Sequence, residues 1–278
     1  MAVSTSPTLN PSNPSSPPTS RLSSWAPAAI LFALCLLAAL VPKQWLAPLD
    51  LVGYAVCHRI PERSFIINNA QLPVCARDTG MFGAALLGLV LFAATLPNRA
   101  TQYPGRPFIW FFLAFFLLWG FDGFNSYVAL LRQTPLIYPP QNWLRLTTGA
   151  FMGISLSAFV VPLFNQAVWR HGDDRPVIPS WTAFARLIGV ALALIAAVLW
   201  RPNFLYGPIA LLSGLSVLVL LTIVNGLLFM LITRRAGRVE HLVQLVGPML
   251  LGLVLTLGEI AAINAFRAAL TRSMNLPF

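Results

Sequence analysis

Apolar residues in this chain are concentrated in long runs, and short polar connections containing Pro, Arg and Asn separate these runs. A bilayer with a hydrocarbon core of about 30 Å requires roughly 20 apolar residues for each crossing helix. We predict transmembrane helices at Trp25–Val41, Thr79–Leu96, Pro107–Leu131, Trp143–Val168, Trp181–Trp200, Tyr206–Thr233 and Leu242–Leu270. The pattern therefore predicts an all-α, polytopic transmembrane helix bundle of about seven spans, with six or eight as alternatives.

The segment that precedes the first run has a different pattern. Residues 1–24 consist mainly of Ser, Thr, Pro and Asn and contain one charged residue, Arg21. With so few bulky apolar residues, burial cannot offset the entropy lost when a backbone becomes ordered. We therefore expect a disordered tail rich in Ser, Pro and Thr.

The composition supports a membrane location. Hydrophobic residues make up 57% of the 278 residues and charged residues 9%, against roughly 45–50% and about 25% in ordinary globular proteins. A soluble chain of this length needs more charge to cover its surface. We therefore expect an integral, multi-pass membrane protein that has the lipid bilayer as its surroundings.

The net charge of +10 arises from 18 basic and 8 acidic residues. In a soluble protein this excess would suggest a nucleic-acid partner. Here the arginines are distributed over most of the connections between apolar runs, so they form no single basic stretch. We interpret them as anchors of helix ends at anionic lipid headgroups and expect no nucleic-acid partner.

A long connection between the first two runs contains most of the candidate chemistry. Its first part, residues 45–56, is apolar but too short to cross a bilayer, which favours an interfacial or re-entrant helix. The following residues include Cys57, His58, Cys75 and Asp78 together with several arginines. We call the whole stretch, residues 45–80, the Cys/His loop.

Two motifs in this loop have a specific spacing. Cys-His-x-x-Pro-x-Arg-Ser-Phe begins at Cys57, and Pro-Val-Cys-Ala-Arg-Asp-Thr-Gly begins at Pro73. Asp122-Gly123 and Arg-Leu-Thr-Thr-Gly, which begins at Arg145, follow in later runs. Together these elements resemble the signature of a prokaryotic family of membrane proteins known as domain of unknown function 2085.

The resemblance extends over about residues 45–155. It implies a multi-pass protein of a prokaryotic plasma membrane, but it implies no activity, because the family has none assigned. We divide the remaining chain accordingly: residues 25–155 form a family-like membrane region, and residues 156–278 supply additional transmembrane helices. The chain departs from the family's pattern at Asp78, where the family has a second cysteine.

The side chains of Cys57, His58, Cys75 and Asp78 offer two sulfurs, one imidazole and one carboxylate. Tetrahedral zinc accepts such a set, although a carboxylate in place of a thiolate makes a purely structural cysteine-type site less favourable. Cys57 and Cys75 would instead form a disulfide if the loop faces an oxidising compartment. A loop held by hydrogen bonds, without metal or disulfide, is the third alternative.

Ionisable residues within apolar runs form the second candidate constellation, because an unpaired charge in a bilayer is costly. Asp122 lies well inside the third run and Glu259 in the middle of the seventh. One interpretation is internal pairing, of Asp122 with Arg145 or an arginine of the loop, and of Glu259 with Asn225 or a backbone group. The other is a polar cavity, and its candidate residues are Arg59, Arg63, Arg77, Asp122, Arg145 and Glu259.

Two classes of function follow from these observations. The first is a binding or structural module whose Cys/His loop is stabilised by a metal, with zinc as the possible cofactor, or by a disulfide. The second is a membrane enzyme or transporter that acts on a lipid or small solute in the polar cavity. We favour the first, because no set of residues with recognisable catalytic roles is present, and the sequence leaves enzymatic activity undecided.

Overall fold

The computed structural model describes residues 36–95 and 99–274. From Ala38 onward the chain forms one compact unit. Its α-helices are α2 (Lys43–Leu46), α3 (Pro48–Val56), α4 (Ala76–Thr95), α5 (Arg106–Arg132), α6 (Asn142–Val168), α7 (Trp181–Trp200), α8 (Tyr206–Ile232) and α9 (Val246–Met274). Three 3-10 helices and four short strands accompany them: η1 (Pro61–Arg63), η2 (Asn203–Leu205), η3 (Leu242–Leu245), β1 (Ile66–Ile67), β2 (Ala70–Gln71), β3 (Ala100–Gln102) and β4 (Asp173–Pro176).

The all-α transmembrane fold is confirmed. Six helices within the described residues are long and apolar enough to cross a membrane, and they correspond to the second through seventh predicted runs. The seventh run differs at its start, because Leu242–Leu245 form a 3-10 turn before α9 begins at Val246. The predicted tail, and residues 25–35 of the first run, lie outside the described residues.

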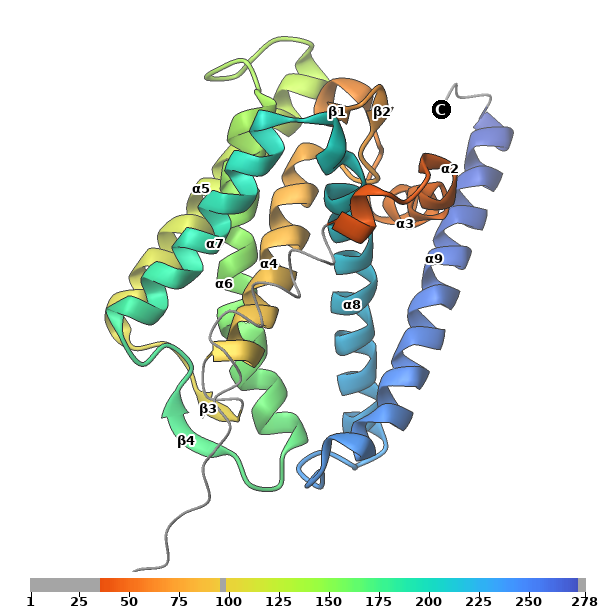
Figure 1. Cartoon of the computed structure of the whole chain (residues 1–278). Helices are drawn as coiled ribbons and strands as arrows, with labels where there is room; N and C mark the ends of the chain where they lie inside the picture. Colours follow the sequence, from red (N-terminus) through yellow and green to blue (C-terminus); the bar gives the residue numbers. More distant parts are fainter. Residues whose placement is uncertain (1–35, 96–98, 275–278) are drawn as a thin grey trace, which may run out of the picture. The chain divides into compact units, whose positions relative to one another are not determined.

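The six long helices alternate in direction. The first residues of α4, α6 and α8 and the last residues of α5, α7 and α9 therefore lie at one end of the unit, where the Cys/His loop also lies (Figure 1). We call this the loop end. Helix α4 contacts α6, α7 and α8, while α5 packs on α6 and α9 packs on α8.

Glycines allow α4 and α6 to approach closely at the loop end. A Cβ atom at Gly149 would lie 2.2 Å from the carbonyl oxygen of Arg77, and one at Gly80 would lie 2.3 Å from that of Leu146. One turn further along α6, a Cβ atom at Gly153 would lie 2.2 Å from the carbonyl oxygen of Met81. This contact brings the first turns of α4 and α6 together, as small residues do between membrane helices.

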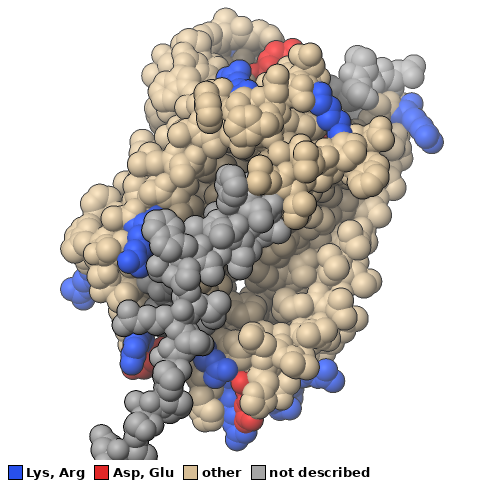
Figure 2. Space-filling model, in the orientation of Figure 1, with Lys and Arg blue, Asp and Glu red and all other residues tan. Residues whose placement is uncertain are grey.

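The outward faces of the bundle are apolar. Trp110 and Leu117 on α5 are 70% and 60% exposed, and Val254 on α9 is 64% exposed. In the space-filling view, Lys and Arg side chains gather toward the ends of the helices (Figure 2). Apolar surface between charged ends is what a bilayer requires of helices that cross it.

At the opposite end, β3 pairs in parallel with β4, and the guanidinium of Arg170 lies 2.6 Å from the carboxylate of Glu240. The hydrogen bond and charge of Arg170 lower the pKa of Glu240. Both side chains are largely exposed. Pairs of this kind contribute little to stability.

Candidate functional site

The second half of the Cys/His loop folds as an ordered hairpin. Strands β1 and β2 are antiparallel and are joined by Asn68 and Asn69, whose φ angles of 52° and 54° are left-handed. Asparagine tolerates this conformation better than most residues with a side chain. The side-chain amide of Gln71 donates hydrogen bonds to the Arg59 carbonyl (2.8 Å) and the Ser64 hydroxyl (2.9 Å), so the hairpin is tied to the first motif.

Three of the four predicted ligand residues come together at the start of α4. One donor atom from each of Cys57, Cys75 and Asp78 lies within 4.8 Å of the other two. Cys57 ends α3, Cys75 directly precedes α4, and Asp78 lies in the first turn of that helix. The Cys75 thiol donates a hydrogen bond of 3.1 Å to Oδ2 of Asp78. We call these three residues the Cys/Asp cluster.

The two cysteines of the cluster are free thiols whose pKa values are shifted in opposite directions. Interaction with the Cys75 side chain, helped by the backbone N–H of Arg59, lowers the pKa of Cys57. The neighbouring Cys57, together with burial and the charge of Asp78, raises the pKa of Cys75 well above its usual value. Of the two, Cys57 is therefore the sulfur that more readily becomes a thiolate.

His58 does not join this cluster. Its side chain is exposed, although it directly follows the buried Cys57. The reason is local: the chain leaves α3 in an extended conformation at Cys57, and consecutive side chains of an extended backbone point in opposite directions. The expectation of a four-residue ligand set that includes His58 is thus not met by the geometry.

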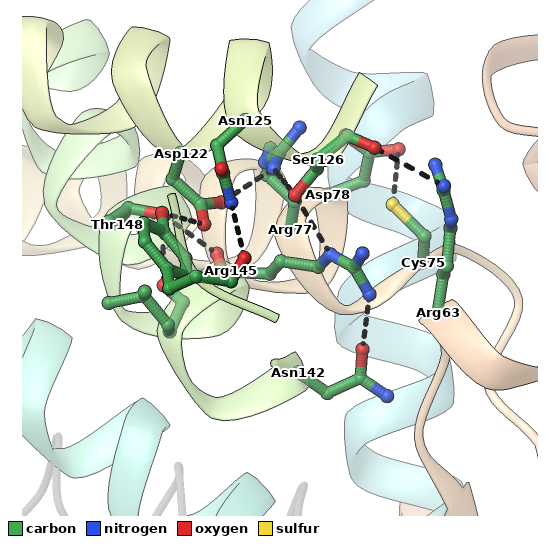
Figure 3. Close-up of polar contacts among 12 residues, drawn as sticks. Arg63, Cys75, Arg77, Asp78, Asp122, Asn125, Ser126, Asn142, Arg145 and Thr148 are labelled. Atoms are coloured by element: carbon green, nitrogen blue, oxygen red, sulfur yellow. Dashed lines mark hydrogen bonds and ion pairs between the residues drawn. The ribbon is translucent and has the colours of Figure 1, made fainter. Parts of the chain in front are cut away.

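The second cluster joins α4, α5 and α6. Arg77 forms a salt bridge of 2.5 Å with Asp122 (Figure 3). The other carboxylate oxygen of Asp122 accepts a hydrogen bond of 2.8 Å from the Tyr138 hydroxyl. Arg77 also donates to the hydroxyl of Ser126 at 3.2 Å. The internal pairing of Asp122 with an arginine of the loop agrees with the first interpretation of this residue.

Arg145 and Arg63 approach the same serine from α6 and from the loop. Arg145 Nε lies 3.5 Å from the Ser126 hydroxyl, and a terminal nitrogen of Arg63 lies 3.4 Å from its carbonyl oxygen (Figure 3). The amide of Asn142 accepts a hydrogen bond of 2.9 Å from Arg145 and donates to the carbonyl of Ser64. We call Arg63, Arg77 and Arg145 the arginine cluster.

The remaining arginine of the predicted cavity, Arg59, points elsewhere and forms a salt bridge of 2.8 Å with Asp50 of α3. A residue that the sequence did not single out as a site residue, Arg267 of α9, holds the loop from the other side. It donates hydrogen bonds to the carbonyl groups of Tyr54 and Cys57, the latter at 3.0 Å, and stacks on the Tyr54 ring at 4.0 Å. Its only signal in the sequence is its presence in a long apolar run.

Glu259 is separate from both clusters. It lies on an exposed face of α9 and accepts a hydrogen bond of 2.9 Å from the amide of Asn225 on α8. The predicted pairing of these two residues is observed, and within the described part of the chain no hydrogen bond or salt bridge joins Glu259 to Asp122. Ser126, Tyr138 and Asn142 were missed as site residues, because polar residues of these types near helix ends are common and carry no distinguishing pattern.

Comparison with known proteins identifies the part of the chain that carries these clusters. The chain is 24% identical over 115 residues to an uncharacterized protein of Methanocaldococcus jannaschii, an alignment that covers 41% of this chain and 67% of that protein. No solved structure gives a significant match. Residues 57–159 match the family described as "Predicted membrane protein (DUF2085)", which confirms the resemblance and includes every residue of the Cys/Asp and arginine clusters.

Proposed function

We propose that this membrane protein is a binding module that holds a thiophilic metal ion, zinc, with Cys57, Cys75 and Asp78. The observation that carries the proposal is the separation of their three donor atoms, all within 4.8 Å of one another. Zinc–sulfur distances of about 2.3 Å and zinc–oxygen distances of about 2.1 Å require donors roughly 3.5–4 Å apart, which small side-chain rotations would provide. The fourth position of a tetrahedral ion would be open to water or a ligand.

The surroundings favour the thiolate form of Cys57, whereas Cys75 holds its proton more tightly. The first turn of α4 supplies Asp78, and the partial positive charge of a helix N-terminus stabilises anions there. The backbone N–H of Arg59 points at the Cys57 sulfur at 3.5 Å. A metal ion would replace the proton that Cys75 now shares with Asp78.

The enzyme or transporter alternative has less support. Hydrogen bonds from Gln71 and Asn142 connect the loop to itself and to α6. Two cavities, one lined by Phe164, Trp169 and Met249 and the other between α5 and α6, contain no residue of the Cys/His loop. A loop tied down by these hydrogen bonds fits a structural or binding role better than a substrate channel.

The test is metal analysis of the full-length protein purified in detergent. The expected result is one zinc ion per chain in the wild type and in His58→Ala, and less than a tenth of that in Cys57→Ser. Asp78→Asn should bind zinc more weakly. The third cysteine provides the matched control, since Cys35→Ser should keep its zinc.

Thiol counting on the same samples separates the alternatives. A wild type that contains no metal and whose Cys57 and Cys75 resist alkylation until reduced would replace the proposal with a disulfide. A wild type with no metal and reactive thiols would remove both. A loss of zinc in His58→Ala equal to that in Cys57→Ser would contradict the assigned ligand set.

A further inference from the structure

The arginine cluster is unusual because three guanidinium groups converge on one serine. Arg77 and Arg145 reach the hydroxyl of Ser126 at 3.2 and 3.5 Å, and Arg63 reaches its carbonyl oxygen at 3.4 Å. The three side chains come from the loop, α4 and α6 and point toward Ser126 of α5 (Figure 3). Like charges this close repel one another, and only the attraction of a nearby anion offsets that repulsion.

The carboxylates nearby do not balance these charges. Among the described residues, Arg77 is the only member of the cluster that forms a salt bridge, and its partner Asp122 is also bound by Tyr138. Arg145 is only 6% exposed, yet its hydrogen-bond partners Ser126 and Asn142 are uncharged. A buried cation without an anionic partner is strongly disfavoured.

The helix ends add to the imbalance. Arg77 lies in the first turn of α4 and Arg145 in the first turn of α6. Helix N-termini carry a partial positive charge, so a cation in this position is unfavourable and an anion is favourable. The close contact at Gly149 brings both helix ends and both arginines to the same place.

We propose that the arginine cluster binds an oxyanion, namely a phosphate group, supplied either by a phospholipid headgroup or by free inorganic phosphate. Guanidinium groups bind phosphate oxygens through paired hydrogen bonds, and helix N-termini contribute further donors. Arg63 is partly exposed, and a fifth of the Arg77 side chain is exposed, so the cluster is open to a ligand. The buried Nε of Arg77 has no hydrogen-bond partner and remains available as a donor.

This site is distinct from the proposed metal site and does not depend on it. Its ligands are the guanidinium groups, whereas the metal would be held by Cys57, Cys75 and Asp78. Cys57→Ser should therefore leave phosphate binding unchanged. If one of the two proposals fails, the other is still decided by its own experiment.

Two binding measurements on the full-length, delipidated protein test the proposal. In the first, inorganic phosphate is titrated in chloride-free buffer. In the second, the protein is placed in nanodiscs of phosphatidylcholine with or without phosphatidylglycerol, and lipid that stays bound through detergent extraction is counted by mass spectrometry. Wild-type protein should bind phosphate, phosphatidylglycerol or both, since either supplies the same chemical group.

The variants locate the binding. Arg145→Gln and Arg63→Gln should each weaken binding about tenfold or more, the effect of losing a charge-assisted hydrogen bond. Arg145→Lys should retain part of the affinity, because the charge remains and the planar fork is lost. Arg132→Gln is the matched control: it removes an exposed arginine at the same end of α5 and should change nothing.

Each outcome is decisive. Binding of phosphate alone assigns a soluble ligand, and binding of phosphatidylglycerol alone assigns a lipid headgroup. Absence of both in the folded wild type would overturn the proposal, and so would equal losses in Arg63→Gln and Arg132→Gln. Among the described residues the Arg63 side chain forms one hydrogen bond, to a backbone carbonyl of α5, so its variant keeps the test valid if Arg145→Gln fails to fold.

Discussion

Asp122 and Glu259 are both carboxylates within membrane-spanning helices, but they differ in exposure and in the residues that they contact. The Asp122 side chain is 2% exposed and contacts the guanidinium of Arg77 and the hydroxyl of Tyr138. Glu259 lies on an exposed face of α9 and bonds only to an amide, that of Asn225, among the contacts described. Two similar residues thus illustrate two ways of placing an acidic group in a bilayer.

The difference follows from the surrounding helices. Asp122 lies in the region that matches the family, where Arg77 of α4 supplies a cation and Tyr138, between α5 and α6, supplies a hydroxyl group. Glu259 lies on the α8–α9 pair, where one neighbouring helix provides one donor. A buried charge depends on its partners, because a charge without one is costly inside a membrane. The family-like region should therefore be the more sensitive of the two to loss of a polar group.

The largest difference is expected between Asp122→Asn and Glu259→Gln. Removal of the Asp122 charge leaves Arg77 unpaired, which should lower the free energy of unfolding by about 3 kcal/mol, the lower part of the range for broken buried pairs. Glu259→Gln keeps an acceptor for Asn225 and should change stability by less than about 1 kcal/mol. Unfolding in mixed micelles by titration with SDS measures both values.

A double substitution sharpens this test. Arg77→Gln combined with Asp122→Asn removes both charges, so it should recover part of the stability that Asp122→Asn alone loses. If the double variant recovers no stability, Asp122 stabilises the protein through an interaction other than this salt bridge. A loss in Glu259→Gln as large as that in Asp122→Asn would end the distinction between the two regions.

Glycine substitutions should give an intermediate effect. In Gly149→Ala the new methyl group would meet the Arg77 carbonyl, so α4 and α6 must separate. Overpacking of this kind reduces stability by about 1–3 kcal/mol. At Gly258 of α9 a Cβ atom meets nothing within 4 Å, so Gly258→Ala should be neutral or slightly stabilising in the same unfolding assay. Equal losses of stability in the two variants would show that the stability of the protein does not depend on the close approach of α4 and α6.

The smallest effect is expected at alkaline pH. Burial and the hydrogen bond to Asp122 raise the pKa of Tyr138 from 10.0 to about 12. The folded protein therefore keeps this proton longer than the unfolded chain, so the stabilising contribution is complete below pH 10 and is lost as the pH rises toward 12. The stability difference between wild type and Tyr138→Phe should shrink over this interval. Tyr127→Phe, which alters a side chain that is 59% exposed, should show no such change.

Much of the fold was predictable because each helix that crosses a bilayer needs a run of roughly 20 apolar residues. Predicted and observed bounds are the same for Trp181–Trp200 and differ by one residue at each end for α5 and at one end for α8. Helix α4 begins three residues earlier than predicted, at Ala76, because its first turn contains Arg77 and Asp78. Charged residues end an apolar run but do not prevent a helix.

The sites were less predictable. The alternating direction of the helices places the loop and the start of α6 at one end, where Arg77 and Arg145 both reach Ser126. The orientation of His58 depends on one extended residue at Cys57, and the partners of Ser126 and Tyr138 depend on how helices rotate about their axes. Apolar periodicity does not determine such rotations when helices are apolar on all sides.

Arg267 has a consequence for how the protein is made. It bonds to the carbonyl of Cys57 across 210 positions of the chain, and the adjoining Asn264 bonds to that of Leu51. A ribosome that has just completed the two motifs has yet to synthesise both side chains. The carbonyl groups of Cys57 and Leu51 therefore cannot form these hydrogen bonds until α9 has been synthesised, after α4 to α8.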